Sequence, residues 1–203
     1  MKEIQIGLIG FGTVGTGVVK ILLEKEGLIQ ALVGAPLKLK RIADLDLLSD
    51  RGILVPQGLL VDRAAEILDD PEISIVIELI GGLEPARSFI LEALEKGKHV
   101  VTANKALLAH KGDEIFRKAA ECQVDIGFEA SVCGGIPVIL ALQQGLVANE
   151  IESILGILNG TSNFILTQMT EEGLPYPAAL KEAQKRGFAE ADPTLDVEGL
   201  DTV

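Results

Sequence analysis

Three glycines near the amino terminus are spaced as in turns that bind phosphate groups. The segment GFGTVG, residues 10–15, fits the pattern G-x-G-x-x-G and stands between a predicted strand and a predicted helix. In that setting the glycines allow a tight turn, a close approach of the backbone to a pyrophosphate and close helix packing, while the helix N-terminus attracts the anion. An ordinary turn between a strand and a helix is the alternative. The pattern predicts a dinucleotide site with contacts from Gly10, Phe11, Gly12, Thr13, Val14 and Gly15.

An acidic residue at the end of the second predicted strand is placed to select the cofactor. Asp44 follows this strand, later than the usual spacing after the glycines because an irregular piece precedes it. Its carboxylate would accept hydrogen bonds from the adenosine ribose and repel a 2′-phosphate, which favours NAD. Arg41 and Arg51 lie close in the sequence, so NADP stays open. A solvated carboxylate in a turn is the alternative interpretation.

A lysine follows another predicted strand, within the segment VVTANKALLAHKG at residues 100–112. Ligands of open α/β sheets lie beyond the carboxyl ends of the strands, so this turn would face the nicotinamide end of the cofactor. A lysine that is partly desolvated and near another cation has a lowered pKa, and it can exchange a proton with a substrate oxygen as hydride moves. A solvated lysine at a strand end is the alternative. The predicted contacts with the cofactor are Thr102, Ala103, Asn104 and Lys105.

The elements that must position these residues alternate along the chain. Short apolar runs alternate with longer runs of helical spacing, which indicates strands that helices bury on both faces. We expect strands at 4–9, 37–43, 73–79, 99–102 and 124–128, helices at 14–23, 62–68, 84–95 and 113–122, and an irregular piece at 27–36; Asp62 is the expected cap of the helix at 62–68. The fold class is therefore α/β, a Rossmann-like doubly wound parallel sheet with right-handed crossovers.

The pattern changes near residue 130, where a second domain is expected to begin. Gly134, Gly135 and Pro137 lead into a helix that we expect to run to about residue 148, and a strand is expected at 151–158. The predicted domains are a dinucleotide-binding domain at 1–130 and the start of a second, α+β domain at 131–203.

Composition excludes several classes of function. Hydrophobic residues make up 48% of the 203 residues and charged residues 24%, which is typical of a globular protein. The net charge of −12 repels nucleic acid and anionic lipid. Cys122 and Cys133 lack the spacing of a zinc site, and no apolar run reaches the roughly 18 residues of a membrane span. We expect a cytoplasmic protein with a small-molecule substrate and with no nucleic-acid or membrane partner.

Six segments, in order along the whole chain, resemble homoserine dehydrogenase. They are GLIGFGTVG, IELIGG followed by EPAR, GKHVVTANKALLA, FEASVCGGIPVI, ILNGTSNFIL and GFAEADPTLDVEGLD. The resemblance implies NAD- or NADP-dependent interconversion of L-homoserine and L-aspartate 4-semialdehyde, in the biosynthesis of threonine, methionine and isoleucine. It also implies a second domain that binds the substrate and forms a homodimer. In this family Lys105 would be the acid and base of catalysis, and Asp201 would help to hold the substrate and this lysine.

The acidic segment near the C-terminus contains Glu190, Asp192, Asp196 and Asp201. The ammonium group of homoserine needs a carboxylate partner, and Glu190 is our first choice, although acidic runs are more often solvated loops. In ILNGTSN, the backbone at residues 159–161 would approach the substrate carboxylate, since a turn into a helix offers free N–H groups. A helix cap by the hydroxyl of Thr161 or Ser162 is compatible with that role. The predicted substrate contacts are Glu190, Asp196, Gly160 and Thr161.

The segment FEASVCGGIP would hold a monovalent cation, usually sodium, if the resemblance applies. Carbonyl and carboxylate oxygens suit a hard cation, although the segment alone indicates only a domain hinge. The implied ligands are the side chain of Glu129 and the carbonyls of Val132, Gly134 and Ile136.

Two features depart from the family pattern. Phe188 stands where many relatives have tyrosine, which puts one contact with the substrate in doubt. The resemblance also expects a second essential lysine one helical turn after Asp201, so we expect the chain to be part of a longer protein and to be inactive by itself. Two other functions stay open: another two-domain amino-acid dehydrogenase, and an NAD-binding module without turnover.

Overall fold

The computed structural model describes residues 3–189 and 193–199, apart from the side chain of Leu195. It contains two compact units, Met1–Val147 and Ala148–Val203. The sequence pattern changes earlier, near residue 130, and a domain boundary at that position stays a prediction. No helix among the described residues is both long and apolar enough to cross a membrane.

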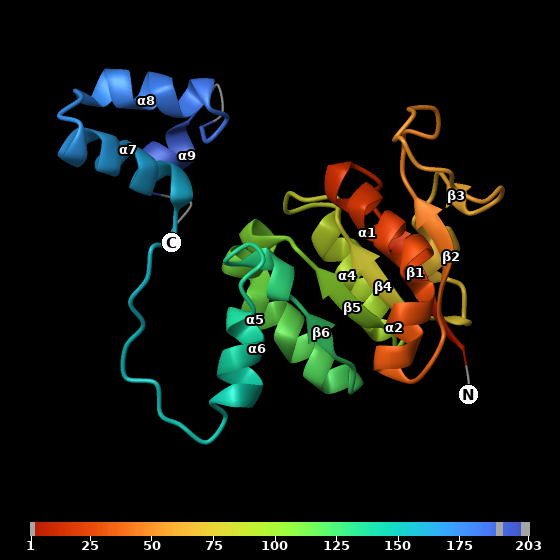
Figure 1. The fold of residues 1–203 in the computed structure, drawn as a ribbon. Coiled ribbons are helices and arrows are strands. Elements are labelled where there is room, and N and C mark those ends of the chain that lie inside the picture. The colour runs from red at the N-terminus through yellow and green to blue at the C-terminus, as the bar shows by residue number, and fades with distance from the viewer. Residues whose placement is uncertain (1–2, 190–192, 200–203) are drawn as a thin grey trace. The chain divides into compact units, whose positions relative to one another are not determined.

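The first unit is built on a six-stranded parallel sheet with the order β3-β2-β1-β4-β5-β6. This confirms the predicted Rossmann-like α/β fold (Figure 1). Chain order reverses between β1 and β4, which is the point where such sheets bind ligands at the carboxyl ends of their strands. The strands are β1 Ile4–Ile9, β2 Leu37–Ala43, β3 Leu60–Val61, β4 Ile73–Glu78, β5 His99–Thr102 and β6 Ile126–Gly127.

Helices cover both faces of this sheet. Alternate side chains of a strand point to opposite faces, so Ile6 and Leu8 pack in one cluster with α1, and Ile9 packs in another with α3, α4 and α5. Figure 1 shows α1 and α4 on opposite faces of the sheet. The helices are α1 Thr13–Glu24, α2 Glu26–Val33, α3 Ala65–Leu68, α4 Ala86–Glu95, α5 Lys105–Cys122 and α6 Val138–Leu140.

The piece at 27–36 that we expected to be irregular is largely helical. Helix α2 runs from Glu26 to Val33 and ends at Gly34, whose φ of 78° lies in the left-handed region. Glycine adopts that conformation without a steric penalty, which makes Gly34 a helix stop signal. The helix has no buried residue, so its apolar side chains do not form the core-facing stripe that identifies most helices from sequence.

Helix α5 begins eight residues before the predicted start, at Lys105 instead of residue 113. The Asn104 side chain caps it by accepting a hydrogen bond from the Leu107 N–H. Gly112 lies buried inside the helix next to the ring of Phe116. A lysine predicted to lie in a turn is thus the first residue of a helix.

Smaller corrections concern short elements. Helix α3 is preceded by Ala64, so Asp62 is not its cap, and β6 covers only two residues of the strand predicted at 124–128. After Pro137, helix α6 passes into a π-helical turn, Ala141–Gly145, and does not reach residue 148. These elements are too short for residue spacing to define their ends.

The strand predicted at 151–158 is wrong. All of these residues are described, and they form no regular secondary structure. A strand forms only by pairing with another, and the described part of the second unit contains no other strand. Its helices are α7 Gly160–Glu171, α8 Tyr176–Lys185 and α9 Thr194–Val197, packed around Ile165, Ala179, Ala183 and Ala189.

A buried lysine braces the amino-terminal edge of the sheet. Lys98 is only 3% exposed, and its Nζ donates to the carbonyls of Asp70 at 2.5 Å and Ile73 at 2.8 Å. Burial lowers the pKa of this ammonium group. We expect Lys98→Met to lower the free energy of unfolding by about 1.5–3 kcal/mol, because hydrogen bonds from a charged donor are lost. Urea unfolding measures this change.

The matched control is Lys96→Met, which removes a more exposed ammonium group two residues earlier. Its ion pairs with Asp69 and Glu92 lie at the surface, where they contribute little. Equal unfolding midpoints for the two variants would contradict the bracing role of Lys98.

Candidate active site

The glycine turn joins β1 to α1 and leaves an open space beside Gly12. Gly10 has a φ of 100°, and a Cβ there would lie 2.7 Å from the Leu79 carbonyl carbon. A Cβ on Gly15 would lie 2.1 Å from the carbonyl oxygen of Gly10, whereas one on Gly12 would meet no atom of the described residues within 4 Å. No side chain in the described part of the protein caps α1, and the first N–H groups of this helix have no acceptor within it. The turn therefore offers N–H groups and room to an anion.

Of the other residues predicted in this turn, Phe11 is buried at 2% exposure, while Thr13 and Val14 are exposed on the first turn of α1.

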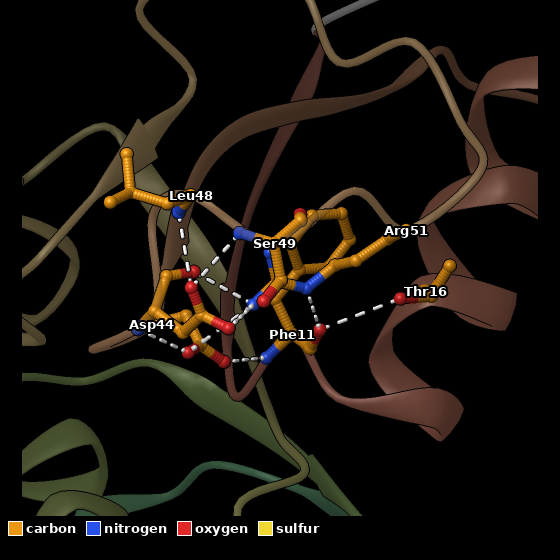
Figure 2. Close-up of polar contacts among 7 residues, drawn as sticks. Phe11, Thr16, Asp44, Leu48, Ser49 and Arg51 are labelled. Atoms are coloured by element: carbon orange, nitrogen blue, oxygen red, sulfur yellow. Dashed lines mark hydrogen bonds and ion pairs between the residues drawn. The ribbon is translucent and has the colours of Figure 1, made fainter.

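Asp44 is fastened to the backbone of the glycine turn. Its Oδ2 accepts a hydrogen bond from the Phe11 N–H at 2.5 Å, and its Oδ1 accepts one from the Asp46 N–H at 2.8 Å. The carboxylate thus lies beside the glycine turn (Figure 2), and it is not the solvated turn residue that was the alternative. Each oxygen keeps a lone pair for a ribose hydroxyl, since a carboxylate accepts about four hydrogen bonds.

Arg51 lies against the same turn and connects it to the loop that follows β2, residues 44–51. Its Nε donates to the Phe11 carbonyl at 2.5 Å, and its other two nitrogens donate to the carbonyls of Ser49 at 3.0 Å and Asp46 at 2.7 Å. The guanidinium lies 4.6 Å from the centre of the Phe11 ring and 3.6 Å from Asp44 (Figure 2). The sequence suggested Arg51 only as a partner for a 2′-phosphate, and it did not indicate this structural role.

Asp46 in this loop has a perturbed carboxyl group. Hydrogen bonds from the Ser49 side chain, and from the amides of Ser49 and Leu48, lower the pKa of Asp46 to about 2. A lowered pKa means that the carboxylate stabilises the loop at pH values above its ordinary pKa near 3.8, and that this contribution is lost as pH falls through about 2.

We expect a carboxyl ¹³C titration of Asp46 to have its midpoint near 2, and Ser49→Ala to move it up toward 3.8. The control Ser88→Ala removes a hydroxyl on α4 that donates to Glu84. A midpoint that Ser49→Ala leaves in place would contradict the assigned cause.

The turn after β5 lies at the same edge of the sheet as the glycine turn. All strands are parallel and only β4 separates β1 from β5, so the two turns begin about 10 Å apart. Thr102 is fully buried and its hydroxyl donates to Glu78, Asn104 is 7% exposed, and Lys105 is exposed. Ala103 lies between them, half-buried. The structure thus brings the predicted cofactor residues of two separate segments to one edge.

The proposed cation ligands share one turn of the chain. Cys133 and Gly134 both have positive φ angles, 55° and 56°, so the backbone reverses direction there. The Glu129 carboxylate accepts hydrogen bonds from the N–H groups of Ile139 at 3.0 Å and Leu140 at 2.8 Å, and so holds the start of α6. The predicted ligands Glu129, Val132, Gly134 and Ile136 all lie in this turn.

In the second unit, the segment ILNGTSN meets the acidic segment at the start of α7. Asn159 caps the helix, with its Oδ1 accepting from the Ser162 N–H at 2.7 Å, so the expected cap by Thr161 or Ser162 is wrong. The Asn159 amide also donates to Asp196 Oδ1 at 2.7 Å. Thr161 donates to the Phe188 carbonyl at 2.6 Å, and Gly160 is the first residue of α7.

Three of the predicted acidic residues, Glu190, Asp192 and Asp201, lie outside the described residues. Sequence reasoning also missed Glu78, a fully buried carboxylate at the end of β4. The available signal was a single charged residue within the largely apolar run ISIVIEL.

Comparison with known proteins identifies the family. A family model described as the NAD binding domain of homoserine dehydrogenase matches residues 10–129, and one described as homoserine dehydrogenase matches residues 137–203. Homoserine dehydrogenase of Bacillus subtilis is 49% identical over 201 residues, which are 99% of this chain and 46% of that protein. The corresponding protein of Synechocystis is 48% identical and is covered to 45% of its length.

Solved structures agree with this assignment. A homoserine dehydrogenase from Thiobacillus denitrificans superposes with a TM-score of 0.89 at 50% identity, covering 99% of this chain and 46% of that one. A hyperthermophilic archaeal homoserine dehydrogenase in complex with NADPH has a TM-score of 0.82 at 28% identity, covering 98% of this chain and 66% of that one. The chain thus spans about half the length of the curated relatives it matches. On its fold, its glycine turn and these matches, the chain belongs to the homoserine dehydrogenase family.

Proposed function

We propose that this chain serves the NAD(P)-dependent interconversion of L-homoserine and L-aspartate 4-semialdehyde. The observation that carries the proposal is the common edge of the sheet, where an uncapped glycine turn and the segment Asn104–Lys105 both follow parallel strands. Membership of the homoserine dehydrogenase family supplies the substrate. The proposal includes action within threonine, methionine and isoleucine biosynthesis.

The glycine turn fits the pyrophosphate of a dinucleotide. Open space at Gly12 and the uncapped N–H groups of α1 suit a doubly charged anion that approaches the backbone closely. Asp44 would hold the adenosine ribose with the lone pairs that the loop leaves to it. When bound, the nicotinamide ring would accept or supply the hydride.

Lys105 is the proposed acid and base. It would give a proton to the substrate oxygen during aldehyde reduction and take one during alcohol oxidation. Its side chain is exposed within the first unit, so bound cofactor and substrate would have to exclude water from it. Asn104 fixes the backbone from which this side chain starts, because it caps α5.

The second unit supplies the proposed substrate contacts. Asp196, Gly160 and Thr161 gather at the start of α7, where helix N–H groups suit the substrate carboxylate. Glu190 is proposed for the substrate ammonium group, with Asp201 as a further support of the substrate and of Lys105.

A monovalent cation is proposed in the turn at 129–136. The donor set of one carboxylate and three carbonyls is made of hard oxygens, which sodium prefers. Glu129 already accepts two N–H groups and keeps lone pairs for an ion. The cation would hold the turn that precedes α6. We extend the proposal to a homodimer and a cytoplasmic location, with Cys122 and Cys133 as free thiols.

The test uses the complete protein, purified and mixed with L-homoserine and either NAD⁺ or NADP⁺. We expect homoserine-dependent formation of the reduced nicotinamide cofactor, which its absorbance measures. A panel of other amino acids tests for a different dehydrogenase, one that oxidises the amino group of its substrate. Cofactor binding without turnover of any panel member would replace the proposal by a nucleotide-sensing function.

The choice between NAD and NADP depends on two opposite charges at one position. The carboxylate of Asp44 repels a 2′-phosphate, while the Arg51 guanidinium, 3.6 Å away, attracts it. We expect Asp44→Asn to shift the ratio of NADPH to NADH affinity about tenfold toward NADPH, equal to ~1.4 kcal/mol, since the amide oxygen can still accept from Phe11. Asp46→Asn is the control, with a smaller shift expected. An unchanged ratio in Asp44→Asn would contradict the selecting role.

A further inference from the structure

Glu78 is a buried carboxylate that the proposed chemistry does not use. It is the last residue of β4, between β1 and β5, and it is 0% exposed. Within the described part of the chain, no lysine, arginine or histidine forms an ion pair with it. Burying a carboxylate is costly unless hydrogen bonds compensate it, so its position demands an explanation from its partners.

The three recorded partners of Glu78 are all hydrogen-bond donors. Oε1 accepts from the N–H groups of Ile80 at 2.8 Å and Gly81 at 3.3 Å, and Oε2 accepts from the Thr102 hydroxyl at 2.7 Å. A carboxylate accepts at both oxygens, whereas an amide would present a donor at one of them. An amide could keep the two N–H partners at its oxygen, but its NH₂ group would replace the acceptor of the Thr102 hydroxyl, so only a carboxylate accepts from all three partners.

Thr102 links Glu78 to Asn104, the residue before Lys105. Its Oγ1 accepts from the Asn104 N–H at 3.1 Å while it donates to Glu78. The Asn104 side chain donates to the Gly82 carbonyl at 2.7 Å and accepts from the Leu107 N–H at 3.1 Å. These bonds close a ring between the loop after β4 and the start of α5.

The loop after β4 also supports the glycine turn. The Leu79 N–H donates to the Ile9 carbonyl at 2.8 Å. A Cβ on Gly10 would lie 2.8 Å from the Ile80 nitrogen, so the two backbones touch. One carboxylate thus fixes a loop that contacts both the cofactor turn and the turn that carries Lys105.

We propose that Glu78 is a positioning residue that sets Lys105 relative to the cofactor turn through Thr102 and Asn104. The inference rests on the proposed function of Lys105. The arrangement itself, a hydrogen-bonded ring that includes Asn104, the N-cap of α5, does not depend on the substrate. Two measurements on the complete protein therefore test separately whether Glu78 holds the ring and whether the ring matters for homoserine oxidation.

The first measurement is amide hydrogen exchange at Asn104 and Leu107. In Glu78→Gln and in Thr102→Val, we expect about tenfold faster exchange, the equivalent of one lost hydrogen bond. Thr102→Ser keeps the hydroxyl and should retain the protection. Lys98→Met is the matched control, because it weakens the opposite edge of the same sheet and leaves the ring intact. Unchanged exchange in Glu78→Gln overturns the proposal, whatever the substrate.

The second measurement is steady-state oxidation of homoserine. We expect Glu78→Gln and Thr102→Val to lower kcat by about 10- to 100-fold, since a displacement of about 1 Å can cost that much, while KM for homoserine changes little. The double variant should be no slower than Glu78→Gln alone, because both changes break one ring. Lys98→Met should keep kcat near its wild-type value, and Thr102→Ser, which retains the hydroxyl, should avoid most of the loss of kcat seen in Thr102→Val.

The outcomes distinguish the proposal from a general loss of stability. Normal kcat in Glu78→Gln, or an equal loss of kcat in Lys98→Met, overturns the positioning role. Absence of homoserine turnover in the wild-type protein overturns the proposed function instead, and the exchange measurement still decides whether Glu78 holds the ring.

Discussion

Replacing Lys105 with alanine in the complete protein is expected to lower kcat for homoserine oxidation by about 10²- to 10⁴-fold. This is the usual contribution of a positioned acid or base. The affinity for NAD(P)H should change little, because the glycine turn and Asp44 supply the proposed cofactor contacts at the phosphates and ribose. Steady-state kinetics and fluorescence titration of the reduced cofactor measure the two quantities.

Two further variants make this prediction specific. Lys111→Ala removes an exposed ammonium group from the same helix α5, and it should leave kcat unchanged. Lys105→Arg keeps the positive charge but cannot release a proton at accessible pH, so it should be nearly as slow as Lys105→Ala. Full activity in Lys105→Arg would show that the charge alone matters and would contradict the acid and base role.

Gly12→Ala is expected to weaken the binding of NAD(P)H by about 10- to 100-fold, equal to ~1.4–2.8 kcal/mol. The added Cβ would have no neighbour within 4 Å among residues 3–189 and 193–199, so the fold should tolerate it, and the methyl group would occupy space that the pyrophosphate needs. Titration of reduced-nicotinamide fluorescence measures the affinity, and thermal unfolding reports on the fold.

Gly17→Ala is the matched control for this substitution. It lies in the second turn of α1, and its Cβ would also meet nothing within 4 Å in the part of the chain that the structure describes. Binding should be unchanged and the helix stabilised by up to about 1 kcal/mol. Equal affinities in the Gly12 and Gly17 variants would place the pyrophosphate elsewhere. Gly15→Ala cannot serve this purpose, because its Cβ would collide with the Gly10 carbonyl and disturb the turn itself.

The regular elements of the first unit could be predicted wherever burial imposed a pattern. The strands β1, β2 and β5 begin and end at the predicted residues. In β1 the apolar run matches a strand whose last four residues are buried. Helix α2 was not predicted because it buries no residue. The predicted strand at 151–158 did not form because its apolar pattern meets no partner strand among the described residues.

In the candidate site, too, some features could be predicted from the sequence and others could not. The glycine spacing and the lysine after a strand were visible in the sequence, because backbone conformation and strand order restrict both. The contacts of Asp44 and Arg51 with Phe11 were not visible, since they join residues more than 30 positions apart through side-chain geometry. Glu78 was hidden for a related reason: its partners are backbone groups and a threonine on another strand.

The sequence by itself determined the family, the parallel α/β sheet and the edge at which the chemistry would take place. The sheet and its edge follow from local spacing, because alternation of strands and helices leaves few possible topologies, whereas the family follows from the resemblance of six segments. Only the tertiary structure decided which polar groups form hydrogen bonds with each other at that edge. Hydrogen bonds depend on distances of a few tenths of an ångström between segments that fold together, and no spacing along the chain specifies them.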